Sequence, residues 1–427
     1  MNLHGWDVVS ALSFPTVNEQ LRRSFGTLPA TFAFLDEGPA GTRLELDGTF
    51  GGWQLETGGG GNLVHVALAI AQGTYLRRNP QGDTRYDLAG VVVTVELLLN
   101  LLPAAGTPGH ELRFDFRTAQ GQVPADPSVF CKNVTLPPGS GIALTGKLLV
   151  GQAITQCLFA HPAAVAYVFA TLGAGSPAGG LPTRSALLTV APAGTDEWYL
   201  AILSAVLPGQ GQGQAALDPA LFAQAAPAVL ALSKEYLLRD VLLPQLPTLF
   251  RHGTGAASFR YEQGAITSTG AFHLDAVKSG ALWYQPVVQQ LNLTVDGDAL
   301  QVRVRGNCYI SPGIYARFAC CSRNPVVVEG QGMRFAADPH PTVEHGVDVA
   351  AWVLAGAVVL ALVAAVVELV VAAVVFGVTM GVTRTLNGIE SACSLQALNP
   401  AFLTWEGFQL QHISSGGLSN NLYLRGD

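Results

Sequence analysis

The chain has 427 residues, of which 49% are hydrophobic and only 12% are charged, and its formal net charge is −7. The length exceeds one ordinary domain of roughly 100–200 residues, and so apolar a composition excludes an intrinsically disordered chain. The 23 basic residues are scattered along the sequence. This excludes nucleic acid as a partner, because binding to phosphates requires a clustered basic surface.

The first half of the sequence predicts one helix followed by many antiparallel strands. We expect a helix over Thr16 to Phe25, and then short β-like runs, punctuated by Gly and Pro, from Thr42 to Thr118. Within them, Tyr86 to Leu102 is a nearly unbroken apolar run, which predicts a strand covered on both faces. A short helix ending near Pro162 and strands through Trp198 to Val206 complete this half.

The repeat of Gly and Gln from Gly209 to Gln214 can bury nothing, and we expect a domain boundary there. It divides the chain into an N-terminal half, 1–212, and a C-terminal half, 213–427. After the boundary, Asp218 and Pro219 are typical of a helix N-cap and first helical residue. Apolar residues at three- and four-residue spacing predict a long helix to about Phe250, kinked at prolines. The candidate lipid contacts on this helix are Phe222, Val229, Leu232 and Tyr236.

The clearest hairpin lies in the second half. Leu291, Leu293 and Val295 alternate with polar residues, Asp296-Gly297 follows, and Leu300, Val302 and Val304 alternate again. Asp-Gly tolerates the positive φ angles of a tight turn, so this pattern predicts an antiparallel hairpin with one wet face.

From Val349 to Val367 there are 19 consecutive apolar or Gly residues, and the run resumes after Glu368 to Val378. Judged by its hydropathy alone, this segment is typical of a transmembrane helix. The flanks lack an excess of Lys and Arg, and alternation at Phe408 and Leu410 predicts a later strand that needs a sheet upstream. We therefore expect an apolar helical segment inside or against the fold, with a true membrane anchor as the alternative. Its candidate lipid or membrane contacts are Trp352, Leu354, Val358, Leu362, Val366 and Leu369.

No pattern of catalytic or metal-binding residues stands out, so we expect a protein that is not an enzyme and holds no cofactor or metal. His340, Glu344 and His345 are the best metal candidates, but neighbouring prolines prevent a zinc-binding helix and favour a loop. The run Gly58 to Gly61 lacks the phosphate-binding pattern and predicts a turn or bulge. The six cysteines lack paired spacing and are expected to be buried free thiols.

Several short stretches occur in an order that resembles the clostridial forty-seven-kilodalton (P-47) protein family. They are Gly5-Trp6-Asp7, Trp53-Gln54-Leu55, Gly58 to Leu63, Leu230-Ala231-Leu232-Ser233, Val241 to Pro244, Trp283-Tyr284-Gln285-Pro286, Ser311-Pro312-Gly313-Ile314 and Phe335 to Pro339. The resemblance implies a tubular lipid-binding (BPI-like) architecture, in which an elongated curved sheet wraps long helices and leaves an apolar groove for acyl chains. It also implies proteins encoded in the same toxin gene cluster as partners.

Taken together, the expected fold class is α+β, mostly antiparallel β, with two pseudo-duplicated halves, since the order of elements nearly repeats. The expected function is a non-enzymatic lipid-binding or membrane-associating accessory protein of a toxin-like or secreted complex. Its expected partners are lipid or fatty acid, a membrane surface and related proteins. The alternatives are a structural partner without bound lipid and an integral membrane protein anchored by 349–378. The N-terminus lacks a signal-peptide pattern, so we expect cytoplasmic synthesis, with release or membrane association left open.

Overall fold

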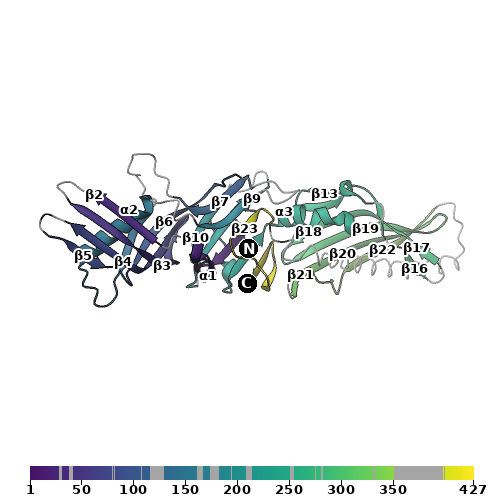
Figure 1. Ribbon diagram of the computed structural model, residues 1–427. Coiled ribbons are helices and arrows are strands. Elements are labelled where there is room, and N and C mark those ends of the chain that lie inside the picture. Colours follow the sequence, from purple (N-terminus) through teal and green to yellow (C-terminus); the bar gives the residue numbers. More distant parts are fainter. Residues whose placement is uncertain are drawn as a thin grey trace.

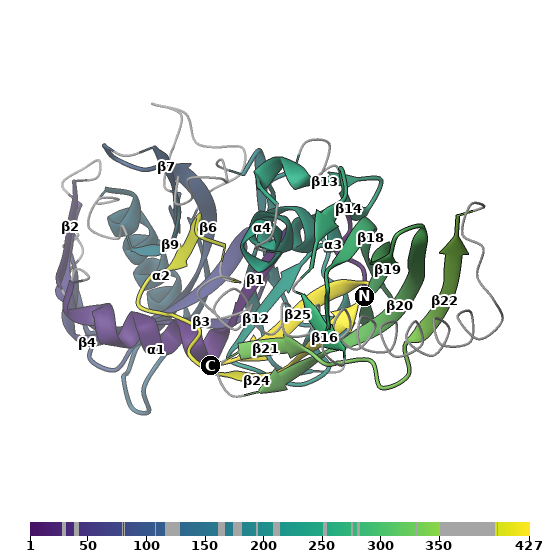
Figure 2. The same ribbon diagram turned by 90° about the vertical axis from the view of Figure 1, so that its right-hand side faces the viewer.

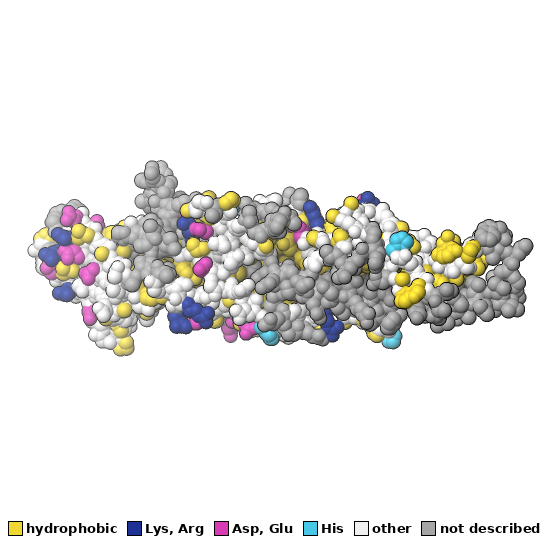
Figure 3. Space-filling view, turned by 45° about the vertical axis from the view of Figure 1, so that its right-hand side comes forward, with side chains coloured by type: hydrophobic (Ala, Val, Ile, Leu, Met, Phe, Trp, Pro, Cys, Tyr) yellow, Lys and Arg dark blue, Asp and Glu magenta, His cyan; other side chains and the backbone are white. Residues whose placement is uncertain are grey.

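The computed structural model is an elongated body made mostly of antiparallel strands (Figures 1 and 3). The residues it describes are 1–27, 31–37, 42–78, 80, 82–106, 108–115, 129–160, 167–173, 182–193, 195–207, 214–250, 254–274, 276–279, 282–329, 332–350, 398 and 400–427. A curved sheet occupies each end, a third sheet lies between them, and both chain termini lie near the middle of the body.

The sheet at the N-terminal end has nine described strands and curves around a helix (Figure 2). Its strands are β2 (Thr31–Glu37), β3 (Arg43–Gly60), β4 (Leu63–Arg78), β5 (Thr84–Asp87), β6 (Val92–Pro103), β7 (Gly109–Phe114), β8 (Val129–Thr135), β9 (Val168–Gly173) and β23 (Leu403–Trp405). β6 confirms the strand expected in the apolar run from Val92 onward, whereas Tyr86 lies on β5 and a turn at Gly90 separates the two strands. Val93, Thr94 and Val95 are buried in succession, so both faces are covered there. Gly58 and Gly59 have positive φ angles at a bulge before the β3–β4 turn, which confirms the expected role of these glycines.

Two helices accompany this sheet. α1 (Phe14–Ser24) begins at Ser13, whose hydroxyl accepts a hydrogen bond from the Thr16 N–H, and it packs on β3. α2 (Leu144–Ala160) lies against β2, β6 and β8. A side chain at Gly151 would place its Cβ 2.5 Å from the Cys131 sulfur, so glycine allows α2 to approach β8 closely. The two helices predicted from the sequence in this half of the chain are thereby confirmed. The remaining short turn in this end is η1 (Phe25–Thr27).

The central sheet combines strands from both sides of the expected boundary. In spatial order they are β10 (Arg184–Val190), β11 (Tyr199–Ala205), β1 (Val8–Ser13), β12 (Ala228–Leu232), β25 (Asn421–Gly426) and β24 (Ile413–Ser419). The carboxylate of Asp7 is fully buried beside it and accepts from the N–H groups of Val206 and Leu207, both at 2.8 Å, and from the Ser233 hydroxyl. These bonds tie the start of β1 to the end of β11 and the end of β12.

The sheet at the C-terminal end has eight described strands and an adjoining two-stranded ribbon. Its strands are β13 (Phe259–Glu262), β14 (Ala265–Ser268), β15 (Phe272–His273), β18 (Pro286–Asp296), β19 (Ala299–Ser311), β20 (Ile314–Glu329), β21 (Gly332–Phe335) and β22 (Thr342–Val349), and the ribbon is β16 (Val277–Ser279) with β17 (Leu282–Tyr284). A short turn, η7 (Ala256–Ser258), precedes β13.

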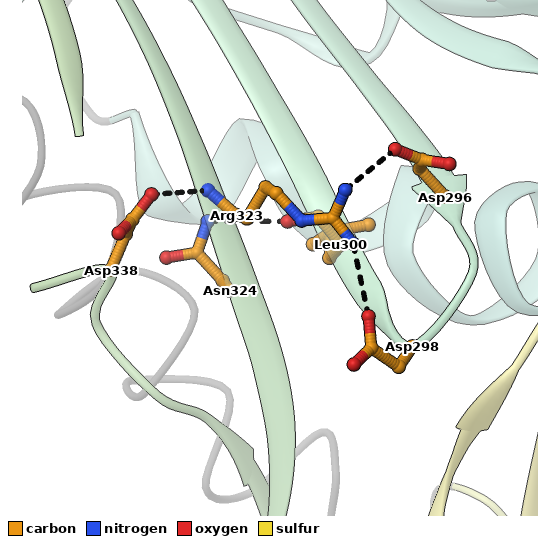
Figure 4. Close-up of polar contacts among 6 residues, drawn as sticks. All are labelled: Asp296, Asp298, Leu300, Arg323, Asn324 and Asp338. Carbon is orange, nitrogen blue, oxygen red and sulfur yellow. Dashed lines mark hydrogen bonds and ion pairs between the residues drawn. The ribbon is translucent and has the colours of Figure 1, made fainter. Parts of the chain in front are cut away.

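The β18–β19 hairpin is the one expected from the alternating pattern. Leu293 pairs with Val302, both side chains are almost fully buried, and Gly297 turns the chain with φ 64°. The guanidinium of Arg323 on β20 binds Asp296 and Asp298, each at 3.0 Å, on the two sides of this turn (Figure 4). The same figure shows the Arg323 N–H donating to Asp338. The turn is therefore held against the neighbouring strand by charge-assisted bonds.

The long helix expected from Asp218 to Phe250 is wrong in its first half. Asp218 does cap a helical turn, but this turn is only η4 (Pro219–Phe222), and the chain then forms strand β12. β12 is buried along its whole length between β1 and β25, so its apolar residues carry no helical periodicity. Helical structure resumes after Ser233 as α3 (Lys234–Tyr236), the π-helical η5 (Leu237–Leu242), η6 (Leu243–Gln245) and α4 (Leu246–Leu249).

The strand expected at Phe408 and Leu410 is also displaced. In this region Trp405 and Phe408 form an isolated bridge, and the strands that return to the central sheet are β24 and β25. The tail does rejoin the sheets upstream, as the sequence suggested. Val349, the first residue of the expected apolar helical segment, is the last residue of strand β22. Residues 351–378 of that segment lie outside the described residues.

Candidate lipid-contact site

A groove of about 540 Å³, which we name the central groove, lies between the central sheet and the segment 403–411. Its floor is one face of two paired strands, where Ser10 of β1 lies opposite Leu230 of β12 and Leu12 lies opposite Ala228. The remaining lining residues are Val229, Leu403, Thr404, Trp405, Gly407, Phe408, Gln409, Leu410 and Gln411. The groove therefore joins segments from the beginning, middle and end of the chain.

The polar groups of the central groove are hydroxyls and amides. None of the 13 described residues that line it is charged. Trp405 ties the wall to the floor, because its indole N–H donates to the Ser10 hydroxyl at 2.8 Å. Phe408 is only partly buried at the groove and Gln409 is exposed. A volume of this size lies within the range of roughly 300–1,000 Å³ typical of ligand pockets. Most of its apolar side chains are buried, and Thr404, Gln409 and Gln411 are exposed.

The structure places the four candidate contacts near Asp218 mainly in the core. The Phe222 ring lies 4.5 Å from that of Tyr199 and is 1% exposed. Val229 belongs to the same smaller core cluster and also lines the central groove. Leu232 is fully buried in the larger core cluster. Their contact with lipid stays a prediction, and only Val229 is at the groove.

Tyr236 is the one candidate on the helical segment that resumes after Ser233. It is partly buried against the larger core cluster. Burial raises the pKa of its phenol to about 12, so the group is neutral at physiological pH. The other six candidates, Trp352, Leu354, Val358, Leu362, Val366 and Leu369, lie outside the described residues.

Sequence reasoning missed most of the groove. Leu12, Leu230 and Trp405 carry no local signal of a shared site, because they come from three segments far apart in the chain. Phe408 and Leu410 were noticed for their alternation, but that pattern predicted a strand and not a groove wall. Only the pairing of β1 with β12 brings these residues together.

A second cavity, of about 530 Å³, lies where β10 approaches β6 and β7. Its lining includes the apolar Leu99, Leu101 and Leu187, but also His110 and Arg184. Arg184 places a cationic side chain at this cavity, whereas the central groove has none among its described lining residues.

The interior of both end sheets is filled by aromatic side chains. At the N-terminal end, Phe114 stacks edge-on with Phe169 at 5.2 Å. At the C-terminal end, Phe250, Phe259 and Phe272 form a cluster with centroids 4.9 to 5.7 Å apart. These rings occupy part of the space beneath the curved sheets.

The described residues contain no group of three or more His, Cys, Asp or Glu placed to hold a metal ion. His340 follows β21 outside regular structure, as expected, but Glu344 and His345 lie on strand β22 rather than in a loop. Neighbours in a strand point to opposite faces, so these two side chains diverge.

The cysteines within the described part of the chain are free. Three of them, Cys157, Cys308 and Cys320, are buried, as expected, and burial raises the pKa of each thiol to about 11. Cys131 and Cys321 are only partly buried. A thiol with a raised pKa is a poor nucleophile at neutral pH.

The curved sheets, the few helices and an uncharged groove define a mostly antiparallel β protein of elongated, half-barrel architecture. A profile of the OrfX-like family, Protein OrfX2/OrfX3/P47, matches residues 3–136 and 195–401, and the chain belongs to this family. The resemblance seen in the short sequence stretches is thereby confirmed.

Individual relatives agree with this family. Protein P47 of Clostridium botulinum (strain Kyoto / Type A2) is 21% identical over 357 residues, which cover 80% of this chain and 82% of that protein. The structure of P47 from Clostridium botulinum A2 matches with a TM-score of 0.76 and 19% identity, covering 100% of this chain and 98% of the other. P47 of Clostridium botulinum E1 matches with a TM-score of 0.70 and 18% identity, covering 99% of both chains. At such identities the two structures show the fold alone.

Residues 351–378 of the expected membrane anchor lie outside the described part of the chain. In that part of the chain, every helix is too short or too polar to cross a bilayer.

Proposed function

We propose that this protein is a non-enzymatic accessory protein that binds the acyl chain of a lipid or fatty acid in the central groove. The observation that carries the proposal is the groove itself, with its volume of about 540 Å³ and a lining free of charged residues. Each methylene moved from water into such a site contributes about 0.8 kcal/mol. Serine, threonine and glutamine side chains at the groove would orient the polar end of the ligand.

Membership of the family supports the wider setting of the proposal. Relatives of the P-47 kind are accessory proteins of toxin gene clusters, and we infer that this chain acts beside related proteins in a toxin-like or secreted complex. The tubular lipid-binding, BPI-like architecture belongs to the same proposal. The arrangement of its two ends supports a pseudo-duplication, since a helical element packs against each end sheet, α2 at one end and Lys234–Leu249 at the other.

The direct test is to purify the protein without detergent and to analyse it by native mass spectrometry and by organic extraction. We expect a lipid or fatty acid at near-stoichiometric amount, and uptake of a fluorescent fatty acid after delipidation. Phe408→Ser should weaken that uptake about tenfold or more, because an aromatic wall of the groove is lost. Thr404→Ser, at an exposed lining position, is the matched control and should bind as the wild type does.

A protein with neither extractable lipid nor fatty-acid uptake would contradict the proposal and favour a structural partner in a complex. One observation favours that second function. Leu144 and Leu148, one turn apart on α2, are 76% and 68% exposed. An exposed apolar pair on a helix is typical of a protein-contact surface, and pull-down with related proteins of the same cluster would test it.

A further inference from the structure

An apolar surface marks the C-terminal end of the elongated body. Trp283, Tyr309, Tyr315 and Val349 are 67%, 50%, 41% and 39% exposed, and we name them the aromatic end. Figure 3 shows hydrophobic side chains gathered toward this end, whereas the opposite end carries many acidic and basic side chains. Single exposed apolar residues are ordinary, but a contiguous group rimmed by polar residues marks an interaction surface.

The sheet register brings these four residues to the same end of the sheet, with Tyr309 and Tyr315 on its outer face. Tyr309 pairs with Tyr315 across the β19–β20 turn, and their rings meet edge to face at 5.5 Å. Val349 pairs with the buried Ile314 at the same turn, so its side chain extends from the face opposite to that of Tyr315. β17, which carries Trp283, lies against β19. The group is thus set on the strands of a rigid sheet at its terminal turn.

A salt bridge forms part of the polar rim. The Arg317 guanidinium binds the Asp348 carboxylate at 2.9 Å, and Asp348 lies opposite Tyr315 in the register. The two side chains are more than half exposed, so this ion pair stays in water at the edge of the aromatic end.

The chemistry of the aromatic end favours a bilayer as its partner. Trp and Tyr have an apolar ring with a polar tip and gather where a membrane meets water. The described chain leaves this end at Ala350, whose N–H donates to the Gly313 carbonyl at 2.7 Å. The sequence that follows begins with 17 consecutive apolar or Gly residues, 351–367. A lipid surface can contact both the exposed aromatic side chains and the apolar run that follows them. A protein partner would need a separate complementary surface for each.

We propose that the aromatic end docks on the surface of a lipid bilayer, with Trp283, Tyr309 and Tyr315 at the depth of the lipid headgroups. This docking extends the proposed function, because the bilayer would supply the lipid that binds in the central groove. In that respect it rests on the proposed function. It places the membrane contact at one end of the body and the groove at its middle.

Flotation with vesicles of pure phosphatidylcholine tests the docking. We expect wild-type protein to float with the vesicles, and Trp283→Ser/Tyr309→Ser/Tyr315→Ser to lower the partition coefficient about tenfold or more. The control is Leu144→Ser/Leu148→Ser, which removes two apolar side chains at the opposite end that are at least as exposed, and it should float like the wild type. Raising the salt concentration should change binding little, because the contact is apolar.

A fluorescence measurement keeps the proposal testable if the triple variant folds poorly. Brominated phosphatidylcholine quenches tryptophan that enters the bilayer, and Trp283→Phe should remove a measurable part of that quenching. The proposal is overturned if the wild type does not float, if the control loses as much binding as the triple variant, or if Trp283→Phe leaves quenching unchanged. Strong salt dependence would overturn it too, and would point to the exposed arginines of β19.

The two proposals fail separately. The triple variant should still take up a soluble fluorescent fatty acid, because the central groove is unchanged. Phe408→Ser should still float with vesicles. Vesicle binding without fatty-acid uptake would retain the docking and refute the groove, and the reverse result would retain the groove and refute the docking.

Discussion

The indole N–H of Trp405 donates a hydrogen bond to the Ser10 hydroxyl at 2.8 Å, and 395 positions separate these residues in the sequence. Trp405 lies on β23, an edge strand of the N-terminal sheet, and Ser10 lies on β1 in the central sheet. The bond therefore links two sheets and closes one side of the central groove.

Trp405→Phe should lower the free energy of unfolding by about 1–2 kcal/mol, because it removes this bond and part of a buried ring. The midpoint of urea denaturation would measure the change. Thr404→Ala, at the exposed neighbouring position, is the control and should change stability by less than about 0.5 kcal/mol. Equal losses in both variants would contradict a structural role for the bond.

The β18–β19 register predicts opposite outcomes for two adjacent substitutions. Val302 is 2% exposed, and Val302→Asp should cost about 3 kcal/mol or more, because an unpaired carboxylate enters the core. Arg303 faces water, and Arg303→Ala should have little effect. Thermal denaturation checks both, and similar shifts in the two variants would mean that the register differs in solution.

Asp7→Ala should be among the most destabilising single changes in the central sheet. The substitution leaves the N–H groups of Val206 and Leu207 and the Ser233 hydroxyl without their acceptor, and we expect a loss of about 3–5 kcal/mol. Asp218→Ala is a useful comparison, because Asp218 also accepts two backbone N–H bonds but is partly exposed. Its loss should be about 1 kcal/mol, and a ranking in the reverse order would be inconsistent with the burial of Asp7.

The protonation state of Asp240 on η5 should make the stability of the folded protein depend on pH. Burial raises the pKa of its carboxyl, and the carboxylate of Asp7 acts in the same direction, whereas Arg239 opposes them. Its Oδ2 atom is buried and lacks a hydrogen-bond partner within the described part of the chain. The pKa of Asp240 is therefore higher in the folded protein than in the unfolded chain. Its contribution to the stability of the folded protein is fully present at pH values below the unfolded pKa.

This stabilising effect is lost as the pH rises through the folded pKa. Asp240→Asn, which cannot ionise, should therefore be more stable than the wild type at pH 7. The advantage should shrink as the pH falls toward the unfolded pKa of about 4. Urea denaturation at several pH values measures it. A constant difference across that range would show that Asp240 does not titrate with folding.

Elements specified by neighbouring residues could be predicted from the sequence. The β18–β19 hairpin follows from alternation and an Asp-Gly turn, and the helix expected over Thr16 to Phe25 is found as α1 at Phe14–Ser24. These signals act over a few residues, within the range in which backbone preference and side-chain periodicity operate. The family could be predicted as well, since the order of short stretches is a property of the sequence alone.

Elements whose conformation depends on distant segments of the chain could not be predicted from the sequence. Ala228–Leu232 follows a helical cap and has good helix formers, yet it is a strand because β1 and β25 flank it. Phe408 and Leu410 alternate like a strand but line a groove, since the neighbouring segment 413–426 takes the sheet positions. Tertiary contacts override a weak local preference when they bury a segment on every side.

The sequence by itself determined the mostly β class, the hairpin register and the apolar, weakly charged character that suits contact with lipid. Only the tertiary structure decided where such contact can occur. The central groove needs strands from residues 8–13 and 228–232 together with the segment 403–411, and the aromatic end needs β17, β19, β20 and β22 to meet at one turn. The physical reason is that burial and exposure depend on packing between segments hundreds of residues apart, which no local pattern encodes.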